Sequence, residues 1–312
     1  MSQIRKPNVQ QLIAAINRHN IESLRKLLTQ GADPNAIIDS DYIRNVSALM
    51  CAAGIQFTEG VETLLKAGAD PNIRTVAGLG AGGGGTALHE AISGSDTRPG
   101  TDRKKSTEED RFRIVDLLLK AGADPNAVNQ GDTLPLCDAA TGGHYEIVQR
   151  LIEAGATFKI WPARCIPPLV AAAGVPAHGV EEGRKQERVA ELLLDLGASV
   201  DGEIADGITA LMTAASRGSE RLINLFLGYG ANVNHRSLDG RTPLICAAGY
   251  AAWAAAQDEY QLALRIVKRL LDVGADPTAR NNQGESAYDI AARSRGPLAA
   301  EYLKKFSVRE TK

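Results

Sequence analysis

The sequence is poor in aromatic residues and in cysteine. Phe, Trp and Tyr make up 4% of its 312 residues, against 31 glycines, so we expect thin layers of small side chains instead of one thick core. Of the four cysteines, Cys51, Cys137 and Cys246 fall in apolar helical runs, and Cys165 falls in a predicted loop. These positions give neither a disulfide framework nor the paired spacing of metal ligands, and they fit a reducing cytoplasm.

An excess of charge of one sign is missing too. The chain has 35 Lys and Arg against 37 Asp and Glu, which leaves a formal net charge of -2 and no general attraction to nucleic acid or anionic membrane. No stretch reaches the roughly 18 apolar residues of a membrane span, and the opening MSQIRKPNVQ lacks the apolar region of a secretory signal. We expect a soluble, cytoplasmic protein that binds neither nucleic acid nor membrane.

Catalytic motifs are also missing. The sequence contains no HExxH, CxxC or GxSxG, and its histidines are scattered along the chain. A histidine and a cysteine that acted together as a nucleophile pair would need support that the sequence does not offer. We therefore expect no enzyme activity, no catalytic residues, no cofactor and no metal.

What the sequence does contain is a recurring phrase. Leu117–Asn126 reads LLLKAGADPN, and altered copies end at residues 35, 72, 159, 201, 234 and 278. Two of the intervals between the glycines of these copies are 33 residues, and the others are 37, 54, 42 and 44. A period in this range is typical of a solenoid, in which similar units stack in a row.

A second phrase alternates with the first and predicts helix starts. It reads TPLICAA from Thr242 and TALHEAI from Thr86, and a hydroxyl at this place accepts hydrogen bonds from the first turn of a helix. Leu134 and Pro167 replace the hydroxyl, so the helices that follow them should begin less firmly. Every unit also has a small residue at one place where neighbouring helices can approach closely: Ala15, Ala52, Ala91, Ala139, Ala172, Ala214, Ala247 and Ala291.

Together the two phrases resemble the ankyrin repeat, in which T-P-L-H-x-A opens the first helix and LL-xx-GADPN closes the second. Thr242–Leu244 and Gly122–Asn126 carry the resemblance, which covers essentially the whole chain, although the histidine is kept only at His89. It implies an all-α solenoid of about eight helix-turn-helix units joined by β-turn fingers. We expect one array over residues 5–312, with residues 1–35 and 281–312 as capping units.

Unequal spacing predicts inserts between the two helices of repeats three, five and seven. The leucine of the second phrase stands 19 residues before the closing glycine in short repeats, and 34, 28 and 30 residues before it in these three. The polar inserts Ser95–Arg111 and Val175–Arg188 are predicted to be loops. The alanine-rich insert Tyr250–Arg265 is predicted to extend both helices, with Trp253 packed between them and Tyr250 exposed.

Two fingers are longer than the others, around Ile38–Asn45 and around Thr75–Gly85. The second contains GxGxxG at Gly80, Gly82 and Gly85. A dinucleotide site would need a preceding buried strand and a βαβ unit, and the neighbouring residues read as the turn of a repeat. We interpret this stretch as a lengthened finger.

The resemblance implies recognition of a protein partner by the fingers and the exposed face of the first helices. We predict a non-enzymatic protein-protein interaction scaffold, such as an inhibitor or specificity subunit, which is a monomer on its own. The alternative is a small enzyme or ligand-binding protein whose site is walled by the inserts of repeats three, five and seven. The contact positions that vary in the family correspond here to Arg74, Trp161, Arg164, Ser216, Arg217, Arg236, Asp239, Arg241, Tyr250 and Arg280. An alternative stays open for these positions: Trp161 packs under its finger, and the arginines are only solvated.

Overall fold

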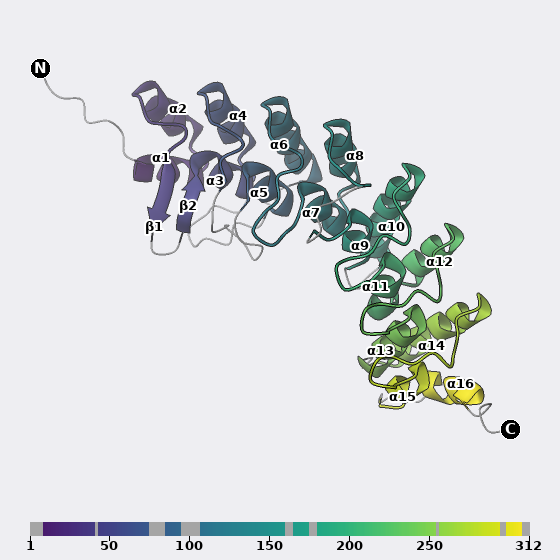
Figure 1. Cartoon of the computed structure of the whole chain (residues 1–312). Coiled ribbons are helices and arrows are strands. Elements are labelled where there is room, and N and C mark those ends of the chain that lie inside the picture. The colour runs from purple at the N-terminus through teal and green to yellow at the C-terminus, as the bar shows by residue number, and fades with distance from the viewer. Residues whose placement is uncertain are drawn as a thin grey trace, which may run out of the picture. The chain divides into compact units, whose positions relative to one another are not determined.

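The computed structural model describes residues 9–40, 43–74, 85–94, 107–159, 165–174, 180–253, 256–293 and 298–307. Within them the chain consists of short helices in pairs and one two-stranded sheet (Figure 1). The elements are α1 (Val9–Asn17), α2 (Ile21–Thr29), β1 (Ile37–Ser40), β2 (Ile43–Ser47), α3 (Ala48–Gly54), α4 (Thr58–Lys66), α5 (Ala87–Ser93), α6 (Glu108–Lys120), α7 (Pro135–Gly142), α8 (Tyr145–Glu153), α9 (Pro168–Ala173), α10 (Val180–Asp195), α11 (Ala210–Arg217), α12 (Glu220–Gly228), α13 (Pro243–Trp253), α14 (Gln257–Asp272), α15 (Ala287–Ala291) and α16 (Leu298–Ser307).

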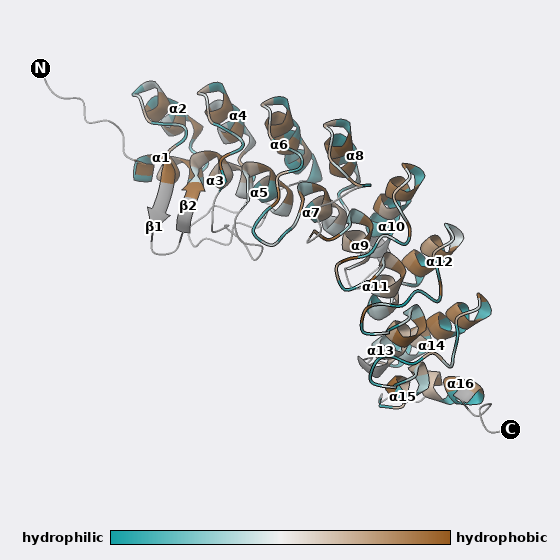
Figure 2. Ribbon diagram, viewed as in Figure 1, coloured by the Kyte–Doolittle hydropathy of each residue, from teal (hydrophilic) through white to brown (hydrophobic). Residues whose placement is uncertain are grey.

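The chain divides into two compact units. Unit 1 comprises Met1–Ala139 and Glu146–Thr157, and unit 2 comprises Ala140–Tyr145 and Phe158–Lys312. In unit 1 the first helices α1, α3 and α5 pack side by side, as do the second helices α2, α4 and α6. In unit 2 the same holds for α9, α11, α13 and α15 and for α10, α12, α14 and α16. Hydrophobic residues lie along the paired helices, and hydrophilic residues follow the turns that join them (Figure 2). This is the all-α solenoid that the repeats predict.

Hydroxyl caps begin four of the predicted helices, whereas the Thr86 hydroxyl lies 3.1 Å from His89 Nδ1. The Ser47 hydroxyl accepts a hydrogen bond from the Met50 amide at 3.2 Å, and the Thr209 hydroxyl accepts one from the Met212 amide at 3.4 Å. Thr242 and Ser286 act in the same way, at 3.3 Å in each case. α9, which follows Pro167, has no side-chain cap, and this agrees with the weaker start expected there.

The alanines at the closest approach of neighbouring helices form the centre of the stacks. All eight are buried, with exposed fractions of 5% at Ala15 and 0% at the other seven positions. A methyl group is the largest side chain that lets two helix backbones approach this closely, because interiors are packed without free space. The sequence prediction for these positions is confirmed.

The asparagine that ends GADPN links one repeat to the next. Asn72 donates from its amide nitrogen to the Gly122 carbonyl, and its amide oxygen accepts from the Asp124 backbone N–H, both at 2.8 Å. Asn35, Asn126 and Asn234 make the same pair of bonds to the following repeat. We call this series the amide ladder. It satisfies backbone groups at each helix end that would otherwise have no partner within the repeat.

Asn72→Ala is expected to lower the free energy of unfolding by about 2 kcal/mol, because it removes two hydrogen bonds of about 1 kcal/mol each. Asn72→Asp is the matched variant: it keeps the acceptor oxygen and loses the donor, so about half of that loss is expected. Urea denaturation followed by circular dichroism measures both. Equal stability of the alanine variant and the parent would contradict this role of the ladder.

The inserts differ in outcome. α13 runs to Trp253 and α14 begins at Gln257, so both helices extend into the third insert as its alanines predict. The prediction of a loop for the whole second insert is wrong, because α10 already begins at Val180. The loop predicted for the first insert is wrong for its last four residues, because α6 begins at Glu108. Residues 95–106 lie outside the described residues, as does the side chain of Trp253.

The lengthened finger after α2 forms a β-hairpin, which the sequence does not predict. β1 and β2 pair antiparallel, with Ile37 opposite Ser47 and Ile38 opposite Val46. Residues 75–84, with most of the GxGxxG stretch, lie outside the described residues. The boundaries of the array and of its capping units stay a prediction.

Candidate functional site

Three finger turns in unit 2 join into a row. Each turn closes on a backbone bond, from Ile204 to Ile208 at 3.1 Å, from Ser237 to Arg241 at 3.0 Å, and from Asn281 to Glu285 at 2.9 Å. The turns are joined to one another through the Leu238 N–H, which donates to Asp206, and the Asn282 N–H, which donates to Asp239, both at 2.9 Å. We call these three turns, residues 203–209, 236–242 and 280–286, the finger row. Backbone bonds between turns hold it as one rigid strip.

Arginine side chains brace this row. Arg241 donates to the Asp239 carboxylate at 2.6 Å, and Arg236 donates to the Arg280 carbonyl at 2.8 Å. Arg280 in turn pairs with Asp289 at 3.0 Å. Burial acts to raise the pKa of Asp239, but the Ser237 hydroxyl and the Arg241 guanidinium outweigh it and hold that pKa below its ordinary value. The bracing carboxylate therefore stays ionised at neutral pH.

A groove of about 530 Å³ opens beside the row, on the first helices of unit 2. We call it the α13 groove. Three of these helices and one finger residue line it: Ser216, Arg217, Arg241, Ile245, Cys246, Gly249, Tyr250 and Ile290. Its lining combines apolar and basic side chains and contains no carboxylate.

Gly249 leaves open space at the floor of the α13 groove. A methyl group added to Gly249 would meet no heavy atom within 4 Å, so the space above this helical position is open. Beside it the Tyr250 ring packs over Gly218, where an added methyl carbon would lie 2.4 Å from the ring. Cys246 is 7% exposed, and burial raises the pKa of its thiol to about 12, so it stays protonated and unreactive at neutral pH.

The structure brings seven of the predicted contact residues together in unit 2. Four of them line the α13 groove, namely Ser216, Arg217, Arg241 and Tyr250, and Arg236, Asp239 and Arg280 belong with Arg241 to the finger row. Tyr250, expected to be exposed, is half-buried.

The other three predicted contact residues do not join this group. Arg74 lies in unit 1, where its guanidinium donates to the Val128 carbonyl of the next finger. Trp161 and Arg164 lie outside the described residues.

Other residues of the site were not foreseen. Ile245, Gly249 and Ile290 look like core residues in the sequence, because a groove floor and a helix contact share the same apolar spacing. Leu238, at a turn of the finger row, is 74% exposed. An exposed leucine on a rigid turn is the one signal that could have marked this place, since turn tips are ordinarily polar.

Unit 1 carries a different set of titratable groups on its first helices. His89 is buried, its Nδ1 lies 3.2 Å from the Thr86 amide, and its Nε2 lies 3.3 Å from the Thr133 carbonyl. Burial lowers its pKa to about 4, so the ring is neutral and bridges two repeats. Burial and the neighbouring Glu90 raise the pKa of Asp138 to about 7. No group of His, Cys, Asp and Glu in the described residues could hold a metal ion.

Asp138→Asn is expected to raise the free energy of unfolding at about pH 8 by about 2 kcal/mol. Between its ordinary pKa of 3.8 and about 7, the folded chain holds a proton on Asp138 that the unfolded chain has released. This contribution to stability is therefore complete below about pH 4 and is lost as the pH rises to about 7. Urea denaturation across this range measures it, with Asp132→Asn in the preceding finger as the control. An equal gain at both ends of the range would contradict the titration of Asp138.

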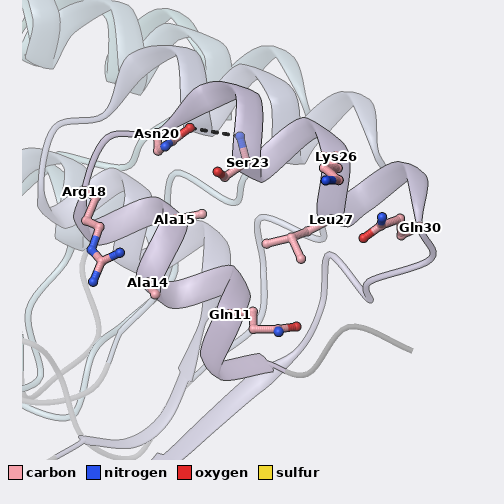
Figure 3. Close-up of a pocket in the computed structure, with 9 residues that line it drawn as sticks. All are labelled: Gln11, Ala14, Ala15, Arg18, Asn20, Ser23, Lys26, Leu27 and Gln30. Atoms are coloured by element: carbon pink, nitrogen blue, oxygen red, sulfur yellow. Dashed lines mark hydrogen bonds between the residues drawn. The ribbon is translucent and has the colours of Figure 1, made fainter. Parts of the chain in front are cut away.

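A second groove, of about 450 Å³, lies between α1 and α2 (Figure 3). Arg18 and Lys26 line it, together with Gln11 and Gln30. Asn20 caps α2 at its edge by accepting a hydrogen bond from the Ser23 amide at 2.9 Å. Its lining is more polar than that of the α13 groove, and it includes none of the predicted contact residues.

Comparison with known families agrees with the fold. Residues 44–76, 83–130 and 239–282 match the family described as ankyrin repeat, and residues 179–256 match the one described as ankyrin repeats in three copies. These segments together span more than half of the chain, which therefore belongs to the ankyrin-repeat family. No curated protein matches the chain. None of the helices in the described ranges has the length and hydropathy of a membrane span.

Proposed function

We propose that this chain is a non-enzymatic scaffold that holds a protein partner against the α13 groove and the finger row. Ankyrin repeats generally mediate protein-protein interaction. The observation that carries the proposal is the convergence of Arg217, Arg241 and Tyr250 on one groove with an apolar floor. Arginine and tyrosine are enriched among the residues that dominate binding energy, because they bury a large area and also form hydrogen bonds.

The rigidity of the finger row supports the same proposal. Leu238 stands on a turn that is joined to its two neighbours by backbone bonds, from the Leu238 N–H to the Asp206 carbonyl and from the Asn282 N–H to the Asp239 carbonyl, so little conformational freedom is lost when a partner covers it. A partner that covered both the row and the groove would bury apolar surface at its centre and meet charged groups at its rim, as stable interfaces do. The chain would then act as an inhibitor or specificity subunit, as a cytoplasmic monomer before it binds.

The lining of the α13 groove favours binding over catalysis. Its titratable groups are two arginines, a tyrosine whose pKa is raised by burial and by Glu259, and the thiol of Cys246. None of these exchanges a proton near neutral pH, so the groove has no general acid or base. The α13 groove is lined by residues of α11, α13 and α15 and by Arg241. The alternative, an enzyme whose site is walled by the inserts of repeats three, five and seven, would need residues from all three inserts.

Gly249→Leu is expected to weaken partner binding at least about tenfold, because the leucine side chain fills the open space of the groove. The fold should remain intact and gain about 0.5 to 1 kcal/mol, since leucine favours a helix more than glycine does. Affinity capture from native lysate, read by mass spectrometry, with parent and variant measures the loss of the partner.

The matched control is Gly228→Leu on α12. Gly228 is also helical, and a methyl group added there also meets no atom within 4 Å, but it is exposed on a second helix away from the groove. This variant should retain the partner in full. Equal capture by all three chains would contradict the α13 groove as the binding site.

A further inference from the structure

The charged side chains that line the α13 groove are both basic. Arg217 and Arg241 line it, Arg236 and Arg280 stand on the adjoining finger row, and no carboxylate lines the groove. The finger row also carries carboxylates, and most of them have partners: Glu203 lies 3.2 Å from His235, Asp239 pairs with Arg241 at 2.6 Å, and Glu285 pairs with Arg293. Asp289 on α15 pairs with Arg280 at 3.0 Å, and Glu259, which acts on Tyr250, accepts a hydrogen bond from the Ala256 N–H at 3.2 Å. Two guanidinium groups are therefore left without an acidic partner among the described residues, those of Arg217 and Arg236.

These two arginines differ from the bracing ones in what holds them. Arg217 is exposed in the last turn of α11, where the negative end of the helix favours a cation. Arg236 is exposed and gives one N–H to the Arg280 carbonyl, and a guanidinium has five N–H groups, so most of its donors remain for a partner. Both carry full charge at any physiological pH.

An apolar floor lies next to this charge. Ile245 and Ile290 contribute side chains to the groove, and Gly249 leaves space between them and the solvent. An occupant that matches both features has an apolar side chain for the floor and carboxylates close to it in sequence for the rim.

We infer that the α13 groove binds a linear acidic segment of the partner, in which an apolar side chain is flanked by Asp or Glu. The apolar side chain lies on Gly249 between Ile245 and Ile290, and the flanking carboxylates pair with Arg217 and Arg236 in forked hydrogen bonds. This inference rests on the proposed function, and it adds the chemistry of the partner to it.

Selection of random twelve-residue peptides displayed on phage, with the full chain as bait, tests the inference. We expect enriched peptides in which Asp or Glu flanks Leu, Ile or Phe. A synthetic copy of an enriched peptide, followed by fluorescence anisotropy, should bind about tenfold more weakly to Arg217→Glu, since an attraction becomes a repulsion, and also about tenfold more weakly when its glutamates become glutamine. Added salt should weaken binding as well.

The matched charge control is Arg269→Glu on α14, which is exposed and donates to Asn224 on the neighbouring second helix. Peptide affinity for this variant should stay within about twofold of the parent. A similar loss at Arg269 and Arg217 would mean a general charge effect and would overturn the inference.

The outcomes separate the inference from the proposed function. If the enriched peptides are neutral or basic, or bind only when their glutamates are replaced by phosphoserine, and Gly249→Leu still abolishes binding, the acidic segment is wrong and the scaffold stands. If the peptides ignore Gly249→Leu, or no peptide is enriched, the groove does not bind a linear acidic segment and the inference fails, whereas the scaffold fails only if Gly249→Leu also captures the partner as the parent does.

Discussion

Phe226→Ala is expected to lower the free energy of unfolding by about 4 kcal/mol. The Phe226 side chain is 0% exposed and is among the largest of the fully buried ones in the described residues. It lies on α12, which packs against α10, α11 and α14, so its loss leaves a cavity bounded by elements that have their own neighbours. Such walls collapse only in part, and the cavity adds to the lost transfer free energy. Urea denaturation followed by far-ultraviolet circular dichroism measures the change.

The control for this cavity is Tyr229→Ala, three residues further along. Tyr229 is 40% exposed, and its hydroxyl bonds the Asp195 carboxylate at the surface. Tyr229→Ala should lower the free energy of unfolding by about 1 kcal/mol or less, because water fills the position of the removed ring. If Phe226→Ala cost no more than Tyr229→Ala, the packing described for α12 would be wrong.

Ala247→Leu is expected to lower the free energy of unfolding by about 3 kcal/mol, because it overfills the core where Phe226→Ala would leave a cavity. Ala247 is 0% exposed on α13, which packs between α11 and α15, and no space exists there for three more carbon atoms. The added side chain forces the helix backbones apart or adopts a strained rotamer. Because each repeat depends on its neighbours for burial, separation at one position weakens the contacts on both faces of α13.

Ala14→Leu is the comparison for overpacking, since Ala14 lies exposed on α1. The same substitution at this surface should change stability by about 0.5 kcal/mol or less, because both residues favour a helix. Thermal melts of the two variants and the parent, at equal protein concentration, distinguish them. A parent-like melt of Ala247→Leu would contradict the close approach of the first helices.

Local rules account for much of the predicted fold. The first helix spans Val9–Asn17, and its apolar residues recur at the spacing of one helix face. The hydroxyl caps and stacking alanines are equally local, since each requires one residue type at one place in a repeat. The first helices that line the α13 groove, and the finger turns before them, belong to the same repeats.

The failure at the second insert has a physical cause. Residues 180–188 are mostly polar, and a segment with so little apolar surface is expected not to fold alone. They do not fold alone, because they form the first turns of α10, and the Gln186 side chain is buried. Gln186 is 6% exposed, and its amide donates to the Thr141 carbonyl at 3.2 Å. A single buried amide is invisible to a count of hydrophobic residues.

The site could be predicted only in part. The arginines and Tyr250 can be predicted, because the resemblance to the ankyrin repeat places them on fingers and first helices. Gly249 and Ile290 could not be predicted as site residues, because the open space of the α13 groove depends on how neighbouring repeats pack, and no residue type encodes that packing. The backbone bonds of the finger row could not be predicted for the same reason, since they join turns of different repeats.

The amide ladder has a consequence for how the chain opens. Lys159 and Asp201 stand where four other repeats have asparagine. Lysine has no acceptor for the next backbone N–H. The Asp201 carboxylate accepts from the Asn232 backbone N–H at 3.0 Å but has no N–H to donate to a carbonyl. In a linear array, cooperativity passes through nearest neighbours, so it is weakest where such links are incomplete. Native-state hydrogen exchange should therefore sort the backbone amides into two groups with different opening free energies, divided near these residues.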